Sequence, residues 1–120
     1  MKKILLVLSA LIVIGNGSAY ANGALAIDGN QGSQYGFSYN YSSMAGAQNK
    51  ALQECGGGCS IVKTFSRGCA AYAADQTSGS TAYGWGTAAD SNSARNTAIQ
   101  LCRNYGGTNC IVRVWGCNSN

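Results

Sequence analysis

Aromatic residues alternate with small or polar ones between positions 35 and 41, in the order Tyr-Gly-Phe-Ser-Tyr-Asn-Tyr. A period of two places every second side chain on the same face, so this segment predicts a β-strand with one aromatic face. A short apolar segment at residues 24–27 predicts a preceding strand. Residues 29–33 lie between the two and have the glycine and amide composition of a turn. Together these segments predict a β-hairpin.

The spacing of apolar residues changes after the hairpin. Apolar residues now recur at the intervals of an amphipathic helix, at Met44, Ala47, Ala51, Leu52 and Cys55. We expect this helix to begin at Ser42 or Ser43, because a serine hydroxyl can accept a hydrogen bond from the free amides of a first turn. Residues 60–65 then predict a further strand.

The same order of elements returns about 47 residues later, so the chain is a tandem duplication. The second copy predicts strands at 70–74, 81–87 and 111–115, a turn at 76–80, and a helix at 91–102 capped by Asp90 or Ser91. We place the repeats at about residues 23–69 and 70–117. We expect an α+β fold in which two tandem ββαβ repeats form one mainly antiparallel sheet with two helices on one face.

The first 21 residues have the composition of an export signal. Lys2 and Lys3 precede an apolar run over residues 4–14, and Ala19-Tyr20-Ala21 has the small-x-small form that a signal peptidase cleaves. We predict cleavage after Ala21 and a single periplasmic or secreted domain over residues 22–120. The apolar run is shorter than the roughly 20 residues of a spanning helix, so we expect no membrane insertion after cleavage.

Cleavage also changes the charge of the protein. The full chain has a net charge of +4, but two of its eight basic residues belong to the leader, which leaves about +2. Nucleic-acid binding requires a dense array of cations, so we expect no nucleic-acid partner. The remaining chain of about 100 residues is too short for two independent cores, so the repeats must share one.

Six cysteines follow the leader, and an even number in a small exported domain favours disulfides. The repeat reduces the number of plausible disulfide pairings, because the two equivalent helices each end in a cysteine and the strands that follow them each begin with one. We predict the pairs Cys55–Cys59, Cys102–Cys110 and Cys69–Cys117, the last of which would join the two repeats. Zinc is the competing use of these residues, but the chain has no histidine and no Cys-x-x-Cys pair.

The absence of histidine excludes Ser-His-Asp and Cys-His catalysis. A carboxylate pair remains, because Asp28 and Asp75 occupy equivalent positions and could face each other as in a glycoside hydrolase. The simpler interpretation is that each begins a hairpin turn through a side-chain hydrogen bond. Residues 28–32 lack the third oxygen ligand and the distant glutamate of a calcium loop. We expect no metal and no cofactor.

The aromatic residues are the one group that could form a conspicuous surface. Alternating aromatics on a strand commonly fill the space beneath a helix, particularly a helix that presents alanines. We assign four of them to the core: Tyr35, Phe37, Tyr83 and Trp85. Tyr39, Tyr41 and Trp115 are the candidate binding residues. The scattered cations are expected to solubilise the surface, namely Lys63, Arg67, Arg95, Arg103 and Arg113.

Three features together resemble a known family. They are the Tyr-Gly-aromatic step repeated at Tyr35 and Tyr83, the Ala-rich helix that ends in cysteine, and the segment Cys110-Ile-Val-Arg-Val-Trp115 that closes at Cys117. The pattern is similar to the bacterial secreted domain of unknown function four-one-eight-nine over residues 23–117. The resemblance implies an exported, disulfide-bonded domain and supplies no catalytic residues.

We therefore expect a non-enzymatic module that binds another protein, for example as an inhibitor, an immunity partner of an exported toxin or a host-directed factor. A cell-wall or glycan-binding module that uses exposed aromatics is the alternative. A small hydrolase based on Asp28 and Asp75 is the third hypothesis, and it requires the two carboxyl groups to share an open cleft.

Overall fold

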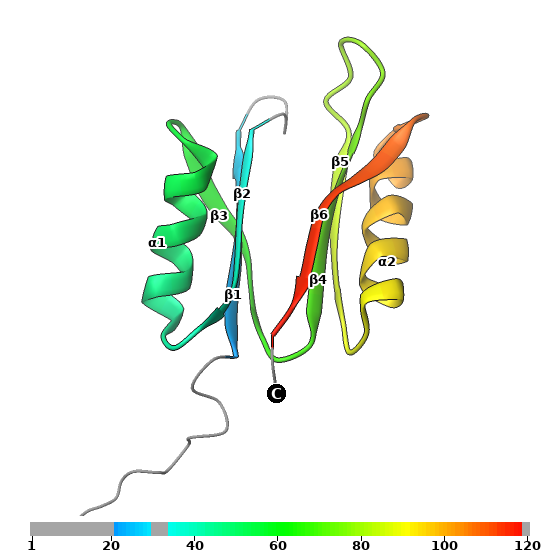
Figure 1. Ribbon diagram of the computed structural model, residues 1–120. Coiled ribbons are helices and arrows are strands. Elements are labelled where there is room, and N and C mark those ends of the chain that lie inside the picture. The colour runs from blue at the N-terminus through cyan, green and yellow to red at the C-terminus, as the bar shows by residue number, and fades with distance from the viewer. Residues whose placement is uncertain (1–20, 30–33, 119–120) are drawn as a thin grey trace, which may run out of the picture.

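The computed structural model describes residues 21–29 and 34–118, so residues 1–20 of the predicted leader and most of the first predicted turn lie outside it. The elements follow the predicted order in each repeat (Figure 1). The first repeat contains β1 (Asn22–Asp28), β2 (Tyr35–Tyr41), α1 (Met44–Cys55) and β3 (Cys59–Ser66). The second contains β4 (Cys69–Asp75), β5 (Tyr83–Ala88), α2 (Ser91–Asn104) and β6 (Cys110–Cys117). No helix in these ranges is long and apolar enough to span a membrane.

Both helices begin at a predicted cap. The Ser43 hydroxyl accepts a hydrogen bond from the N–H of Gly46 at 3.0 Å, and the Asp90 carboxylate accepts one from the N–H of Ser93 at 3.0 Å. Each bond satisfies an amide that has no partner within its helix. The two helices therefore start at equivalent points of the repeat.

Each repeat forms its own three-stranded antiparallel sheet with its first strand in the middle, giving the orders β2-β1-β3 and β5-β4-β6. Equivalent residues pair in the same way. Ala26 of β1 lies opposite Gly36, and Ala73 of β4 lies opposite Gly84. The α+β class and the tandem ββαβ repeat are confirmed.

The arrangement of the sheets corrects the expected single sheet. The two sheets pack face to face, and each helix covers the outer face of its own sheet, giving the layer order α1, first sheet, second sheet, α2 (Figure 1). The aromatic faces of β2 and β5 explain the difference. On one sheet with both helices on the same side, that face would lie open to water, whereas stacking two sheets buries it from both repeats.

Glycines hold each helix close to its sheet. Gly36 of β2 lies against the Ala51 carbonyl of α1, and Gly84 of β5 lies against the Ala98 carbonyl of α2. A Cβ atom at Gly84 would lie 2.6 Å from the Ala98 oxygen, which is closer than packed atoms allow. The facing helix stripes are small and fully buried, at Ala47, Ala51, Ala94 and Ala98. Large side chains of the sheets must therefore point away from the helices.

The space between the sheets holds those large side chains. Tyr72 of β4 is fully buried there, with its ring centroid 5.2 Å from that of Tyr35 and 6.1 Å from that of Tyr83. Phe37 of β2 stacks on Phe65 of β3 at 5.9 Å. Burial raises the pKa of Tyr72, so its phenol stays neutral. All four aromatics assigned to the core pack against this cluster, but between the sheets and not beneath a helix as expected.

Asn118, just beyond β6, ties the two repeats together at one end of the sandwich. Its Nδ2 donates to the carbonyls of Ala21 at 3.0 Å and Phe65 at 3.5 Å, and its Oδ1 accepts from the N–H of Asn40 at 2.7 Å. Its own backbone N–H donates to the Gly68 carbonyl at 2.8 Å. Because Asn118 is buried, water cannot easily replace these partners.

Ala21 belongs to the same junction. It is 1% exposed, and its carbonyl also accepts from the N–H of Arg67 at 2.9 Å. Arg67 and Gly68 form the turn from β3 into β4, and both have positive φ, 64° and 67°. The residue predicted to end the leader is thus packed and hydrogen-bonded within the sandwich, while the cleavage position itself stays a prediction.

The three predicted disulfides are present: Cys55–Cys59, Cys102–Cys110 and Cys69–Cys117. The first two connect the end of a helix to the start of the following strand. The third closes the second sheet and does not join the repeats as expected, because Cys69 begins β4 and lies directly opposite Cys117 of β6. The equivalent pair in the first sheet is Asn22 and Ser66, which carries no bridge.

We expect Gly36→Ala to lower the free energy of unfolding by about 2–3 kcal/mol, because the added methyl overlaps the Ala51 carbonyl and forces α1 off its sheet. Gly57→Ala is the matched control, since no heavy atom lies within 4 Å of a Cβ built there. It should change stability by less than about 0.5 kcal/mol. Urea unfolding followed by circular dichroism measures both, and equal midpoints for the two variants would contradict the close approach.

Asn118→Ala is expected to cost about 2–3 kcal/mol of stability, because it removes the three hydrogen bonds by which this buried amide of the second repeat holds backbone groups of the first. Asn104→Ala, at the exposed end of α2, removes the same side chain without that loss. Urea midpoints for the two variants test the junction. A cost at Asn118 no larger than at Asn104 would mean that the amide contributes nothing to joining the sheets.

Candidate functional site

Tyr39 and Tyr41, two of the candidate binding residues, do not share a surface. Tyr39 is 43% exposed, lies 5.7 Å from the Phe37 ring and packs against Gly116 of β6. Tyr41 instead packs against the cluster beneath α1. Asn40, with φ of 64°, lies at a register shift in the β1–β2 pairing and reverses the alternation. The two tyrosines therefore lie on opposite faces of β2.

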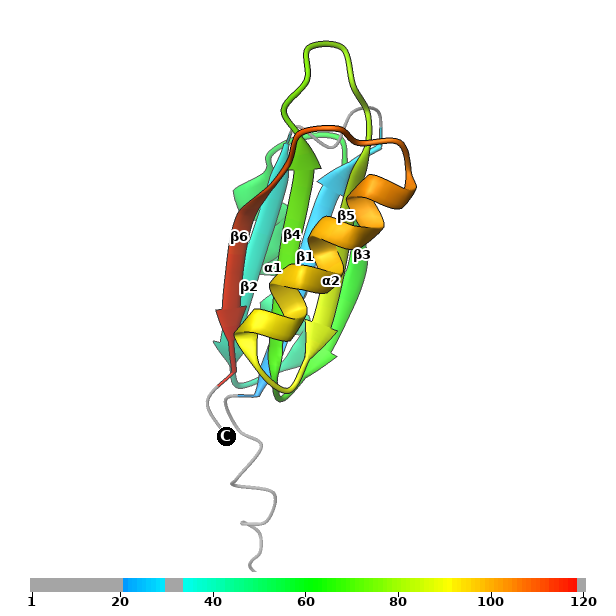
Figure 2. The same ribbon diagram turned by 90° about the vertical axis from the view of Figure 1, so that its right-hand side faces the viewer.

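Trp115, the third candidate, is 44% exposed on β6, an edge strand of the second sheet. It lines a groove of about 450 Å³ between β6 and α2, together with Asn92, Arg95 and Asn96 of the helix. Figure 2 shows α2 crossing the outer face of this sheet, with β6 along its edge. The groove combines an indole ring with amide and guanidinium groups.

Arg95 is fixed within this groove. Its guanidinium lies over the Trp115 ring, 4.9 Å from the centroid, and its Nε donates to the Ser91 carbonyl at 3.3 Å. Its Nη2 donates to the side-chain oxygen of Asn92. Across the described ranges no carboxylate forms an ion pair with Arg95. The guanidinium is therefore held in one orientation with donors left for a ligand.

A second guanidinium lies on the other face of β6. Arg113 lies over the Tyr35 ring at 5.6 Å and donates from Nη1 to the side-chain oxygen of Gln76 at 3.3 Å. The Tyr35 hydroxyl donates in turn to the Arg113 carbonyl at 3.4 Å. An arginine thus lies over an aromatic ring on each face of β6: Arg95 of α2 over Trp115, and Arg113 of β6 over a tyrosine of β2.

The first repeat has neither the tryptophan nor the arginine of this groove. Thr64 pairs with Ala24 as Trp115 pairs with Ala71, so threonine takes the place of the tryptophan. Gln48 takes the place of Arg95 along the helix. The fold consequently does not need either residue. Arg95 and Arg113 were expected only to solubilise the surface, and comparing the two repeats position by position is the sequence signal that could have singled them out.

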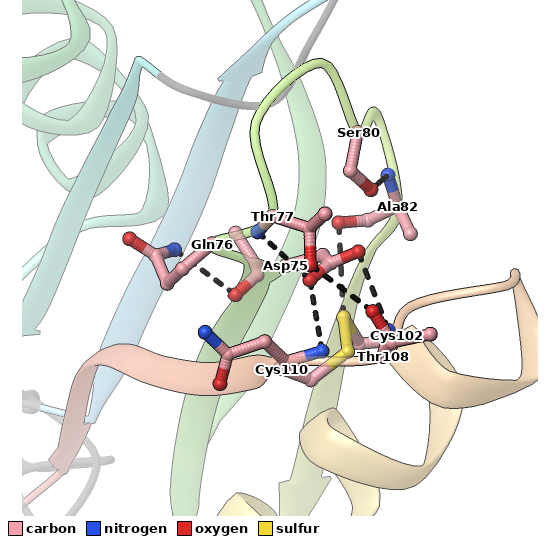
Figure 3. Close-up of a disulfide and its surroundings, with 10 residues drawn as sticks. Asp75, Gln76, Thr77, Ser80, Ala82, Cys102, Thr108 and Cys110 are labelled. Atoms are coloured by element: carbon pink, nitrogen blue, oxygen red, sulfur yellow. Dashed lines mark hydrogen bonds between the residues drawn. A yellow bond between two sulfur atoms is a disulfide. The ribbon is translucent and has the colours of Figure 1, made fainter.

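Asp75 serves a structural role at the end of β4. Its carboxylate accepts from the backbone N–H groups of Thr77 at 3.1 Å, Thr108 at 3.3 Å and Asn109 at 2.9 Å. These bonds connect the hairpin turn after β4 to the loop before β6, beside the Cys102–Cys110 disulfide (Figure 3). The turn interpretation from the sequence accounts for this aspartate.

The same hydrogen bonds set the protonation of Asp75. The bond from the Ser80 side chain, and then those from Thr77 and Asn109, lower the pKa of this carboxyl well below its ordinary value. A glycosidase general acid needs the opposite shift. Asp28, the other carboxylate of the proposed pair, accepts from the N–H of Gln34 at 3.4 Å at the end of β1. These contacts favour the turn role over the hydrolase hypothesis.

Metal-ligating side chains do not cluster in the part of the chain that the structure describes. No group of three or more cysteine, aspartate or glutamate residues lies within reach of a common ion there. All six cysteines are engaged in disulfides.

We expect the stabilising contribution of Asp75 to depend on pH. Because its folded-state pKa lies below the ordinary value of 3.8, the contribution is complete above about pH 4 and declines as pH falls toward the folded-state pKa. The difference in urea midpoint between wild type and Asp75→Asn should therefore be largest near neutral pH and shrink below about pH 4. A difference that stays constant from neutral pH to about pH 2 would contradict the assignment.

The comparisons with known proteins identify a family for this chain. The family model described as Domain of unknown function (DUF4189) matches residues 22–117, which runs from the first residue of β1 to the last residue of β6. Neither the curated proteins nor the solved structures compared with the chain gave a match. Since the match covers both repeats and all six cysteines, the chain belongs to the DUF4189 family.

Proposed function

We propose that the chain is an exported, disulfide-stabilised module without enzymatic activity that binds another protein through the β6 side of its second repeat. The observation that carries the proposal is an exposed tryptophan, Trp115, on a strand with a disulfide at each end, to Cys102 through Cys110 and to Cys69 through Cys117. Partly exposed tryptophan and arginine side chains are the residues that most often anchor protein interfaces.

Rigidity supports this role. A side chain on a cross-linked strand loses little freedom when a partner binds, so more of the contact energy appears as affinity. The Arg95 guanidinium stacked on the ring restricts Trp115 further. Three disulfides also suit a periplasmic or secreted protein, in keeping with the leader that the sequence predicts. Such a module could act as an inhibitor, an immunity partner or a host-directed factor.

A glycan or cell-wall ligand is the second candidate, because Asn92 and Asn96 beside the indole could hydrogen-bond sugar hydroxyls. The position of Arg95 weighs against it. Sugar rings stack on an open aromatic face, and one face of Trp115 is already covered by the guanidinium. Sedimentation with peptidoglycan that is lost in Trp115→Thr would favour the glycan.

The test of the proposal is affinity capture with the immobilised domain from periplasmic and secreted fractions. We expect wild type to retain a protein that Trp115→Thr, which introduces the residue of the first repeat, fails to retain. Tyr105→Ala is the control, because it removes an aromatic ring that is 65% exposed on another part of the second repeat. If Trp115→Thr retains the same proteins as wild type, the β6 side is not the binding surface.

A further inference from the structure

We infer that the groove between α2 and β6 binds a carboxylate of an acidic, extended segment of the partner protein, with Arg95 as the residue that contacts it. The inference rests on the proposed protein-binding function and names the chemistry of its ligand. It follows from the charge of the groove, the orientation of Arg95 and the difference between the two repeats.

Charge complementarity indicates an anion. The residues that line the groove include two arginines, Arg95 and Arg113, and no aspartate or glutamate. The nearest acid in sequence, Asp90, already caps α2 by accepting from the N–H and hydroxyl of Ser93 at 3.0 and 2.9 Å. Within the described residues the one ion pair is Lys50–Glu54 on α1, so Arg95 has no internal counter-ion. An incoming carboxylate would supply it.

The orientation of Arg95 suits a carboxylate in particular. Its Nε and one Nη2 donor are used by Ser91 and Asn92, and the Trp115 ring covers one face of the guanidinium plane. The remaining donors lie at the edge of that plane. Planar carboxylates accept from such an edge, and little side-chain entropy is lost because the arginine is already ordered.

An extended peptide fits the shape of the site. The groove follows β6, and an adjacent peptide strand places successive side chains on opposite faces. One face of β6 has Arg95 of α2 over Trp115, and on the other Arg113 of β6 itself lies over the Tyr35 ring. A segment with acidic residues at neighbouring positions could therefore meet a guanidinium on both faces, as in edge-strand recognition.

The experiment uses a short oligoglutamate peptide as the probe and the purified disulfide-bonded domain. We expect saturable binding at low ionic strength, measured by isothermal titration calorimetry, that weakens at least about tenfold in Arg95→Gln. This variant introduces the residue found at the equivalent position of α1, so the fold should tolerate it, and an unchanged urea midpoint checks this. Lys63 is exposed on β3, so Lys63→Gln removes one positive charge from another part of the surface. This control variant should bind the peptide like wild type.

Tryptophan fluorescence locates the binding. In a Trp85→Phe background Trp115 is the single tryptophan. Its fluorescence emission should therefore change when oligoglutamate is added. The emission should not change on this addition when Arg95→Gln is introduced into the same background. Calorimetry on the unaltered domain gives the affinity comparison even if Trp85→Phe does not fold. Absence of saturable binding, or equal weakening by Arg95→Gln and Lys63→Gln, would overturn the inference.

Two further ligands separate the possible sources of the anion. An oligogalacturonate that binds more tightly than the peptide would reassign the site to acidic sugars, and inorganic phosphate that displaces the peptide at lower concentration would reassign it to phosphate. Because the titration needs no partner, its failure is distinct from failure of the capture experiment. A partner whose capture depends on Trp115 but not on Arg95 would leave the proposed function standing and remove the acidic ligand.

Discussion

The close contact between each helix and its sheet is the constraint from which the rest of the structure follows. Glycines on β2 and β5 and alanines on the helices leave no room for large side chains between these layers. Every bulky residue of the central strands must then point to the other face, where water would surround it in a single repeat. Neither repeat can bury that face alone, so the duplication is what makes the domain stable.

Local patterns allowed most of the fold to be predicted. The period-two and helical spacings located the strands and helices, and the equivalence of the repeats gave the disulfide pairing. The stacking of two sheets was missed because alternation shows that β2 has an aromatic face but not what covers it. Asn118 was missed because a single amide after the last strand belongs to no pattern, and its partners lie up to 97 positions away.

The candidate site shows the same limit. Trp115 stood out as an aromatic residue, whereas Arg95 looked like one of several scattered cations. The fold brings them together because α2 lies across the sheet that ends in β6 (Figure 2). The two repeats act as an internal comparison: where they agree, in glycines, alanines and helix-end cysteines, the residues serve the fold. The second repeat differs from the first in Arg95, Trp115 and the Cys69–Cys117 bridge, and these differences all lie on or beside β6.

The buried position of Ala21 has a consequence for the predicted cleavage after this residue. In the folded domain the peptide bond between Ala21 and Asn22 lies where a packed residue enters β1, and the Ala21 carbonyl is held by Arg67 and Asn118. A protease must draw an extended segment into its own active site, which this bond cannot supply without unfolding of the junction. If a leader is removed after Ala21 as the sequence predicts, the cleavage has to precede closure of the sandwich by the second repeat.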